Sequence, residues 1–202
     1  MATYLETQQR IATELNRSDL SSPIQSAIKS AIAYYKKRRF WWNETTGSLS
    51  CTTSQAYVSL PSDFVDLDYL QITIGSSINE LRRVSYFDIV KWRANSSSGQ
   101  PTDYDLYQNR IELFRVPDST YTLTIHYVKE LTVLANDSDE NAWLTDGEEL
   151  IRCHAKRDLY IHNIRNTAAA QDMQAMTDSA LLRLESQNTR RTTTGRTRAY
   201  YL

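Results

Sequence analysis

One stripe of side chains in this chain has the spacing of a metal site. His154, Asp158 and His162 follow one another at intervals of four residues, so a helix would present all three on one side. Imidazole and carboxylate groups are ligands that zinc accepts, but a site also needs a ligand from another segment and partners that orient the imidazoles. We interpret the stripe as a polar face between helices or subunits and predict no metal and no cofactor. The alternative is an enzyme built around His154 and His162.

Other arrangements that could support catalysis are missing. The sequence has no phosphate-binding loop, no glycine-rich dinucleotide fingerprint and no Gly-x-Ser-x-Gly nucleophile elbow. Cys51 and Cys153 stand alone, outside any Cys-x-x-Cys motif, and we expect both to be reduced and at least half buried. A run of carboxylates falls in a loop and in the first turn of a helix, where negative charge is favourable: Asp137, Asp139, Glu140, Asp146, Glu148 and Glu149. We therefore predict that the protein is not an enzyme.

Charge is distributed unevenly along the 202 residues, although the formal net charge is only -1. A basic block (Lys36, Lys37, Arg38 and Arg39) contrasts with the acidic residues Asp137, Asp139 and Glu140. Such patches could pair between copies of a chain that repeats around a ring, so we treat these seven residues as candidate subunit-interface charges. No stretch resembles a secretion signal or a membrane span, and we expect a protein made in a cytosol with no membrane partner.

The last fifteen residues, Asn188 to Leu202, have an unusual composition. They hold four arginines and no acidic residue, and they end on three apolar side chains. The residues concerned are Arg190, Arg191, Arg196, Arg198, Tyr200, Tyr201 and Leu202. Terminal aromatic residues gain most of their free energy by burial, so we predict an extended arm that docks on another protein. The alternative is a frayed terminus.

Hydrophobic periodicity predicts an α+β fold with four long helices around a block of strands. Apolar residues recur at helical spacing over 3–17, 22–38, 145–164 and 168–187, whereas the segment between 46 and 130 is rich in β-branched and aromatic residues. Helices that open and close a chain usually pack together. We therefore expect mainly an α-helical bundle of two N-terminal (1–45) and two C-terminal (131–187) helices, a β-rich central insertion (46–130) and the extended arm (188–202).

Local signals refine this prediction. Ser22 and Pro23 suit the start of the second helix, and two pairs have capping-box spacing, Ser85 with Asp88 and Thr145 with Glu148. Gln108-Asn109 is typical of a tight hairpin between strands. In the last helix we expect five residues to face inward, namely Met173, Met176, Ala180, Leu181 and Leu184.

The two basic segments also suggest contact with nucleic acid through phosphates. No helix-turn-helix or ribonucleoprotein signature supports sequence-specific recognition. Phe40, Trp41 and Trp42 could stack on bases, but we favour a role in the hydrophobic core at the exit of the second helix. A non-specific nucleic-acid-binding accessory protein is therefore the alternative function.

Several segments, in this order, resemble the head-to-tail adaptors of tailed bacteriophages, also called connectors or head-completion proteins. They are Arg39-Phe40-Trp41-Trp42-Asn43-Glu44-Thr45, Tyr57-x-Ser59-Leu60-Pro61-x-Asp63-Phe64, Gly99-Gln100-Pro101-Thr102-x-Tyr104, Pro117-Asp118-x-x-Tyr121-x-Leu123-x-Ile125-x-Tyr127, Asn141-x-Trp143-Leu144 and Glu149-Leu150-Ile151-Arg152. The resemblance runs from about residue 3 to the C-terminus, with one departure at Arg115, where a second proline is expected.

The resemblance implies a structural protein of the virion neck. Adaptors of this kind are similar to helical bundles with a β-rich insertion, and they form a ring of about twelve copies beneath the portal. Their C-terminal arms grip the portal, the ring extends the DNA channel, and its far side receives the tail or nozzle. The implied partners are the portal protein, a tail or nozzle protein, further copies of the same chain, and double-stranded DNA in weak, non-specific contact.

Overall fold

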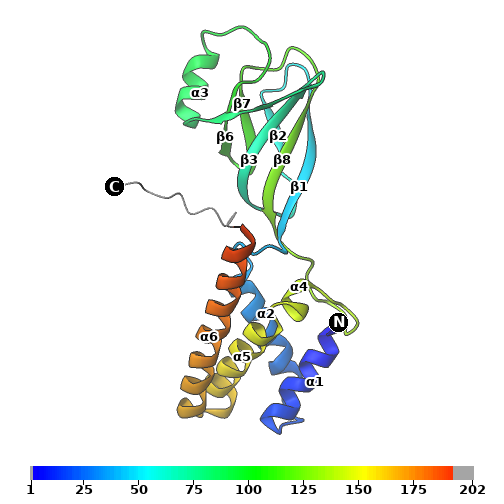
Figure 1. The fold of residues 1–202 in the computed structure, drawn as a ribbon, viewed down its shortest axis with the longest axis vertical. Helices are drawn as coiled ribbons and strands as arrows, with labels where there is room; N and C mark the ends of the chain where they lie inside the picture. The colour runs from blue at the N-terminus through cyan, green and yellow to red at the C-terminus, as the bar shows by residue number, and fades with distance from the viewer. Residues whose placement is uncertain (1, 193–202) are drawn as a thin grey trace, which may run out of the picture. The chain divides into compact units, whose positions relative to one another are not determined.

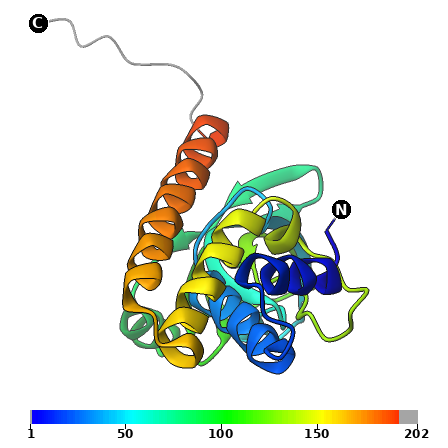
Figure 2. The same ribbon diagram turned by 90° about the horizontal axis from the view of Figure 1, so that it is seen from below.

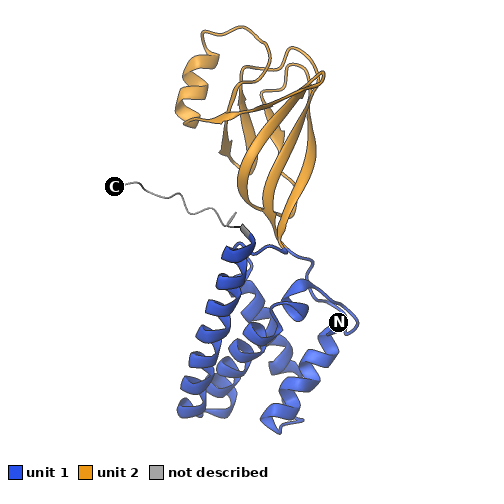
Figure 3. Ribbon diagram, in the orientation of Figure 1, with its two compact units in different colours: residues 1–42, 131–202 blue, residues 43–130 orange. Residues whose placement is uncertain are grey.

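The fold is taken from a computed structural model that describes residues 2–192. The chain divides into two compact units, one of residues 1–42 and 131–202 and the other of residues 43–130 (Figure 3). Within the described residues there are six helices and two sheets, which confirms the predicted α+β class (Figure 1). The first unit is helical and the second consists mainly of strands.

The helical unit is organised around α5 (Glu148–Leu159), which packs against α1 (Tyr4–Leu15), α2 (Ser21–Tyr35) and α6 (Thr167–Thr192). The short helix α4 (Ala142–Thr145) precedes α5, and a π-helical turn, η1 (Tyr160–Ile164), follows it. Ile11, Ile28 and Ile151 are fully buried between these helices. Because α5 is surrounded on three sides, it contributes more buried residues than its neighbours do.

The exit of α2 is covered by aromatic side chains. Phe40 stacks on Trp42 with ring centroids 4.6 Å apart, and both rings pack edge-on against Trp143. Phe40 and Trp143 are 1% exposed, so these side chains belong to the core of the helical unit, as the sequence predicts. The prediction that Met176 faces inward is wrong, because this side chain is 54% exposed whereas Thr177 and Ala180 are buried.

The second unit contains two four-stranded sheets. One has the order β1-β8-β3-β4, built from β1 (Glu44–Cys51), β8 (Tyr121–Lys129), β3 (Phe64–Ile74) and β4 (Ser77–Glu80). The other has the order β2-β7-β6-β5, built from β2 (Tyr57–Ser59), β7 (Arg110–Phe114), β6 (Asp103–Tyr107) and β5 (Arg82–Arg83). Leu70, Ile111 and Leu123 belong to the buried core of this second unit.

Turns and caps follow the sequence only in part. Gln108 and Asn109 have φ values of 51° and 58° between β6 and β7, which is the left-handed geometry of the predicted tight hairpin. Helix α3 (Tyr86–Arg93) begins after Ser85, but the Ser85 side chain makes no capping bond, and the Tyr86 N–H donates to the Asp105 carboxylate. Gly147, and not Thr145, precedes α5, since Thr145 still belongs to α4. Both predicted capping boxes are therefore wrong.

The start of α2 and the end of α6 also differ from the sequence prediction. Helix α2 begins at Ser21, so Ser22 is a helical residue and not the N-cap. Helix α6 continues to Thr192, and an extended arm beginning at residue 188 is therefore wrong. No glycine or proline occurs between Thr167 and Thr192, and the Thr189 hydroxyl donates to the Glu185 carbonyl. Residues 193–202 lie outside the described part of the chain.

Candidate assembly interfaces

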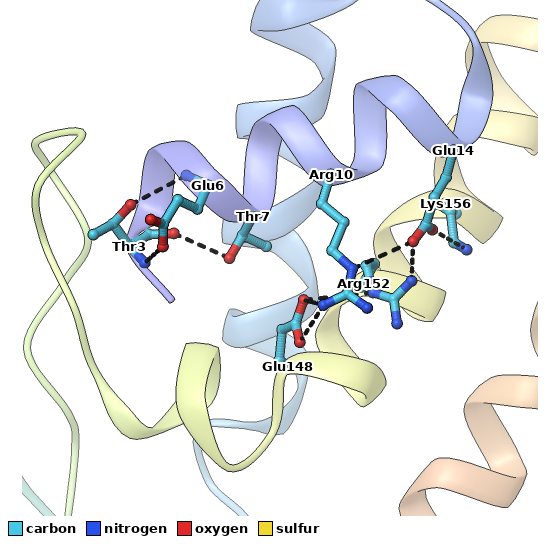
Figure 4. Close-up of polar contacts among 8 residues, drawn as sticks. All are labelled: Thr3, Glu6, Thr7, Arg10, Glu14, Glu148, Arg152 and Lys156. Atoms are coloured by element: carbon cyan, nitrogen blue, oxygen red, sulfur yellow. Dashed lines mark hydrogen bonds and ion pairs between the residues drawn. The ribbon is translucent and has the colours of Figure 1, made fainter. Parts of the chain in front are cut away.

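Ion pairs join α1 to α5 in the helical unit. Glu148, Arg152 and Lys156 recur every four residues along α5, and Arg10 and Glu14 have the same spacing on α1 (Figure 4). Arg10 donates to both carboxylate oxygens of Glu148, at 3.0 and 3.1 Å. Glu14 accepts from the Lys156 Nζ at 2.6 Å and also from Arg152. Opposite charges on two helices are therefore matched along two turns.

Glu14 is the centre of this network. Burial alone would raise the pKa of its carboxyl group, but the hydrogen bond from Lys156 and the positive charges of Lys156, Arg152 and Arg10 outweigh that effect. The pKa of Glu14 consequently lies below its ordinary value. The sequence reasoning missed this site, although the four-residue spacing on both helices was a usable signal.

The start of α1 is held by the acidic loop. Thr3 and Glu6 form a capping box (Figure 4). The Leu5 N–H donates to the Asp137 carbonyl at 3.0 Å. Asp139 accepts hydrogen bonds from the N–H groups of Ala135 and Asn136, which lower the pKa of its carboxyl group. Two of the three acidic residues proposed for a subunit interface thus have roles within the chain, whereas Glu140 is exposed.

The histidine stripe does not assemble into one site. His154 is buried, with Nδ1 3.0 Å from the Tyr35 hydroxyl and Nε2 2.8 Å from an Arg157 nitrogen. Asp158 lies 3.6 Å from His154 but also binds Arg157, and His162 is exposed. Among residues 2–192, no group of three or more histidine, cysteine, aspartate or glutamate side chains is placed to hold a metal ion.

The basic block is used partly within the chain. Arg38 donates to the Glu185 carboxylate at 2.7 Å, which joins the end of α2 to the C-terminal part of α6. Lys36 is the C-cap of α2, and Lys37 and Arg39 are exposed. The block thus follows α2, because this helix ends at Tyr35 and not at the predicted residue 38.

The last turns of α6 lie beside the aromatic residues that follow α2. The Arg191 guanidinium is 4.2 Å from the centre of the Trp41 ring, and the Asn188 amide donates to the Arg39 carbonyl at 3.4 Å. Arg190 is exposed in the same turn. Of the seven residues proposed for docking, Arg190 and Arg191 are therefore helical, and the other five (Arg196, Arg198, Tyr200, Tyr201 and Leu202) fall outside the described residues.

The helical unit thus has paired charges between α1 and α5. None of the helices in residues 2–192 combines the length and the apolar character that a span of a lipid bilayer requires. The model of one protein family, described as the SU10 adaptor protein, matches residues 2–199. The chain therefore belongs to the SU10 adaptor protein family, and its resemblance to the head-to-tail adaptors of phages is confirmed. No curated protein matches it.

Proposed function

We propose that the chain is a structural subunit of the virion neck, made in the host cytoplasm. About twelve copies form a ring beneath the portal, extend the DNA channel and carry the tail or nozzle. The observation that supports this most directly is the family match, which spans residues 2–199 and thus both units. In this proposal the helices of the first unit form the bundle of the ring, and residues 43–130 are the β-rich insertion, which begins before the predicted residue 46 because β1 starts at Glu44.

Docking to the portal is assigned to the C-terminal segment. Because residues up to Thr192 are helical, residues 193–202, which lie outside the described part of the chain, remain as the candidate docking arm. Arg190 and Arg191 then form the helical base of the arm, while Arg196, Arg198, Tyr200, Tyr201 and Leu202 follow it. The arginines suit acidic portal surface, and the three apolar side chains suit a hydrophobic groove, where each contributes about 1.5–3 kcal/mol on burial.

Contacts between copies are assigned to the exposed charges that remain after the internal pairs are formed. The side chains of Arg38, Asp137 and Asp139 bind groups of their own chain, and the Asp137 carboxylate does so by accepting from the Gln8 amide at 3.5 Å. Lys37 and Glu140 are exposed. We therefore reduce the seven candidate interface charges to Lys37 and Glu140 as the leading pair. Contact with the passing double-stranded DNA is weak and independent of sequence in this proposal, and no reaction is catalysed.

Removal of residues 193–202 tests the docking role. The truncated chain keeps every described residue of α6, so its circular dichroism should match that of the full chain, but its co-sedimentation with portal rings should be lost. A second variant, Tyr200→Ser with Tyr201→Ser, separates the apolar contacts from those of the arginines. Electron microscopy of the full chain with portal should show an added ring. Undiminished portal binding by the truncated chain would contradict the docking role, and a portal without an added ring would contradict the function.

A further inference from the structure

The sheet β1-β8-β3-β4 of the β-rich unit has two open edges. β1 lies beside β8 at one side, and within residues 2–192 no strand pairs with the outer side of β1 or of β4 (Figures 1 and 2). β1 pairs with β8 in one continuous register, has no proline and carries no charged residue after Glu44. Soluble proteins usually protect such an edge with a charge, a proline or a bulge, so an unprotected edge indicates a partner strand.

The register shows which backbone groups of β1 face the open side. The Lys129 N–H donates to the Asn43 carbonyl at 2.8 Å, and the same register continues along β1. Hydrogen-bonded pairs alternate along antiparallel strands, so the odd-numbered residues of β1 bond to β8. The backbone N–H and C=O groups of the even-numbered residues therefore point to the open side. These residues include Thr46, Ser48 and Ser50, whose side chains are exposed.

The same alternation applies to β4 at the other edge. The Leu81 N–H donates to the Leu70 carbonyl at 2.9 Å, in the register that pairs β4 with β3. The backbone N–H and C=O groups of Ile78 and Glu80 therefore point away from β3. Every residue of β4 is exposed, and the Ile78 side chain is 65% exposed. A large apolar side chain on an open edge favours contact with another protein.

The two open edges are complementary to each other. Neighbouring strands in this sheet are all antiparallel, so β1 and β4 at its two ends run in opposite directions. β4 of one copy and β1 of the next copy in the same orientation are then again antiparallel. Directly paired residues share a face of a sheet, and one exposed row runs across this one. It consists of Ser50, Thr122, Thr73 and Ile78. The buried and exposed faces thus continue from copy to copy.

We infer that β4 of one copy pairs with β1 of a second copy, so that the sheets of neighbouring copies join into one. The inference rests on the ring proposed above and identifies the strands that join its subunits. A contact between two different edges leaves one of each open, so further copies add until the ring closes. At about 4.8 Å between strands, four strands in each of about twelve copies give a radius of about 37 Å, which leaves room for a DNA duplex.

Charge limits how the two strands align. Of the alignments that keep both Ile78 and Glu80 opposite outward residues of β1, one places Glu80 opposite Glu44. Like charges at directly opposed positions are unfavourable, which excludes this alignment. Ile78 therefore lies opposite Ser48 or Ser50. In either case the two outward residues of β4 form about four main-chain hydrogen bonds with β1, one for each N–H and C=O group.

Paired cysteines test this contact in the full chain assembled with portal. Under mild oxidation, Ile78→Cys should give a ladder of covalent oligomers when combined with Ser48→Cys or with Ser50→Cys. Within one chain, β8 and β3 separate β1 from β4, so these cysteines are too far apart for a disulfide. The matched control combines Ile78→Cys with Thr122→Cys, which is exposed in the same row but belongs to β8. The control and each single variant should give no more than the wild type, whose two cysteines are buried.

A proline substitution gives an independent measurement. Ser48→Pro removes an N–H on the open side of β1 and no bond to β8, so the free chain should keep its circular dichroism. It should lower the fraction assembled on portal by roughly tenfold or more, since proline cannot donate to the added strand. The matched control is Ser59→Pro on β2, an edge strand of the other sheet. The Leu113 N–H donates to the Ala56 carbonyl, so by the same alternation the Ser59 N–H points away from β7. This control should assemble like the wild type.

The outcomes separate this contact from the proposed function. A cross-link from Ile78→Cys to β1, together with loss of assembly in Ser48→Pro, supports the joined sheets. A ring seen by electron microscopy that gives neither cross-link and tolerates Ser48→Pro overturns this inference alone. The absence of any ring overturns the proposed function as well.

Discussion

Arg157 donates to Nε2 of His154 from a distance of 2.8 Å. A guanidinium group has donors only, so Nε2 must be unprotonated, and Nδ1 carries the proton toward the Tyr35 hydroxyl, 3.0 Å away. Burial lowers the pKa of His154, and the positive charge of Arg157 lowers it further, with a smaller opposing effect of Asp158. The fold therefore keeps this imidazole neutral.

The first prediction concerns stability between pH 7 and pH 5. The unfolded chain binds a proton at His154 near pH 6.5, whereas the folded chain resists protonation, so stability should be complete above about pH 6.5 and fall below it. His154→Gln should make the free energy of unfolding less dependent on pH in this range. Urea titrations at several pH values measure this. An unchanged pH dependence in the variant would show that another group is responsible.

The second prediction concerns the charge network of α1. The folded pKa of Glu14 is lowered, so its contribution is complete above the unfolded value, near pH 4.3, and is lost as the pH falls through the folded pKa. Glu14→Ala should cost about 1–3 kcal/mol at pH 7, because Arg152 and Lys156 lose their shared carboxylate. Chemical denaturation measures the loss. Gln9→Ala, at an exposed position of the same helix, is the control for helix propensity.

A third prediction compares two leucines of α6 that differ in burial. Leu184 is 7% exposed and Leu182 is 67% exposed. Leu184→Ala should lower the stability of the monomer by about 2–5 kcal/mol, whereas Leu182→Ala should change it by no more than about 0.5 kcal/mol. Thermal unfolding of both variants gives the comparison. Equal losses would mean that α6 is oriented differently from the structure.

The fourth prediction concerns the β-rich unit. Arg93 of α3 donates to the carbonyls of Leu113 and Ala56, at 2.8 and 2.6 Å, and forms an ion pair with Glu112. Arg93→Ala removes all three contacts and should destabilise this unit by about 2–4 kcal/mol. Hydrogen exchange should increase in β2 and β7 while that of α5 is unchanged. Lys91→Ala, on the exposed side of the same helix, should have no comparable effect.

The sequence predicted the elements better than their ends. Hydrophobic periodicity identified α1, α2 and α6, because one side of each helix is buried, and the Gln108-Asn109 turn was recognised because its backbone geometry favours asparagine and glycine. The end of α6 was misplaced because a run of arginine and threonine is compatible with both helix and arm. Contacts with Trp41 and Arg39, which come from a distant segment, accompany the helical form.

Site residues were harder to predict for a related reason. The pairing of Glu14 with Arg152 and Lys156 joins segments more than a hundred residues apart, and neither segment alone shows which helix will cover it. Asp137, Asp139 and Glu140 were predicted to lie at a subunit interface because they concentrate negative charge. The Asp139 carboxylate instead accepts hydrogen bonds from backbone N–H groups of its own turn. The partner of a charged side chain depends on how the helices pack, and the sequence of one segment does not determine that packing.

The way in which the β-rich unit begins and ends has a consequence for how such a protein can change. Lys129 donates its N–H to the Asn43 carbonyl at 2.8 Å, and Glu44 pairs with Val128, so the entry and exit of this unit are neighbouring strands. The chain therefore enters and leaves this unit side by side, at Asn43 and Lys129. A segment whose two ends lie side by side can enter a helical chain at a single point, which is the geometry that the insertion or exchange of a domain requires.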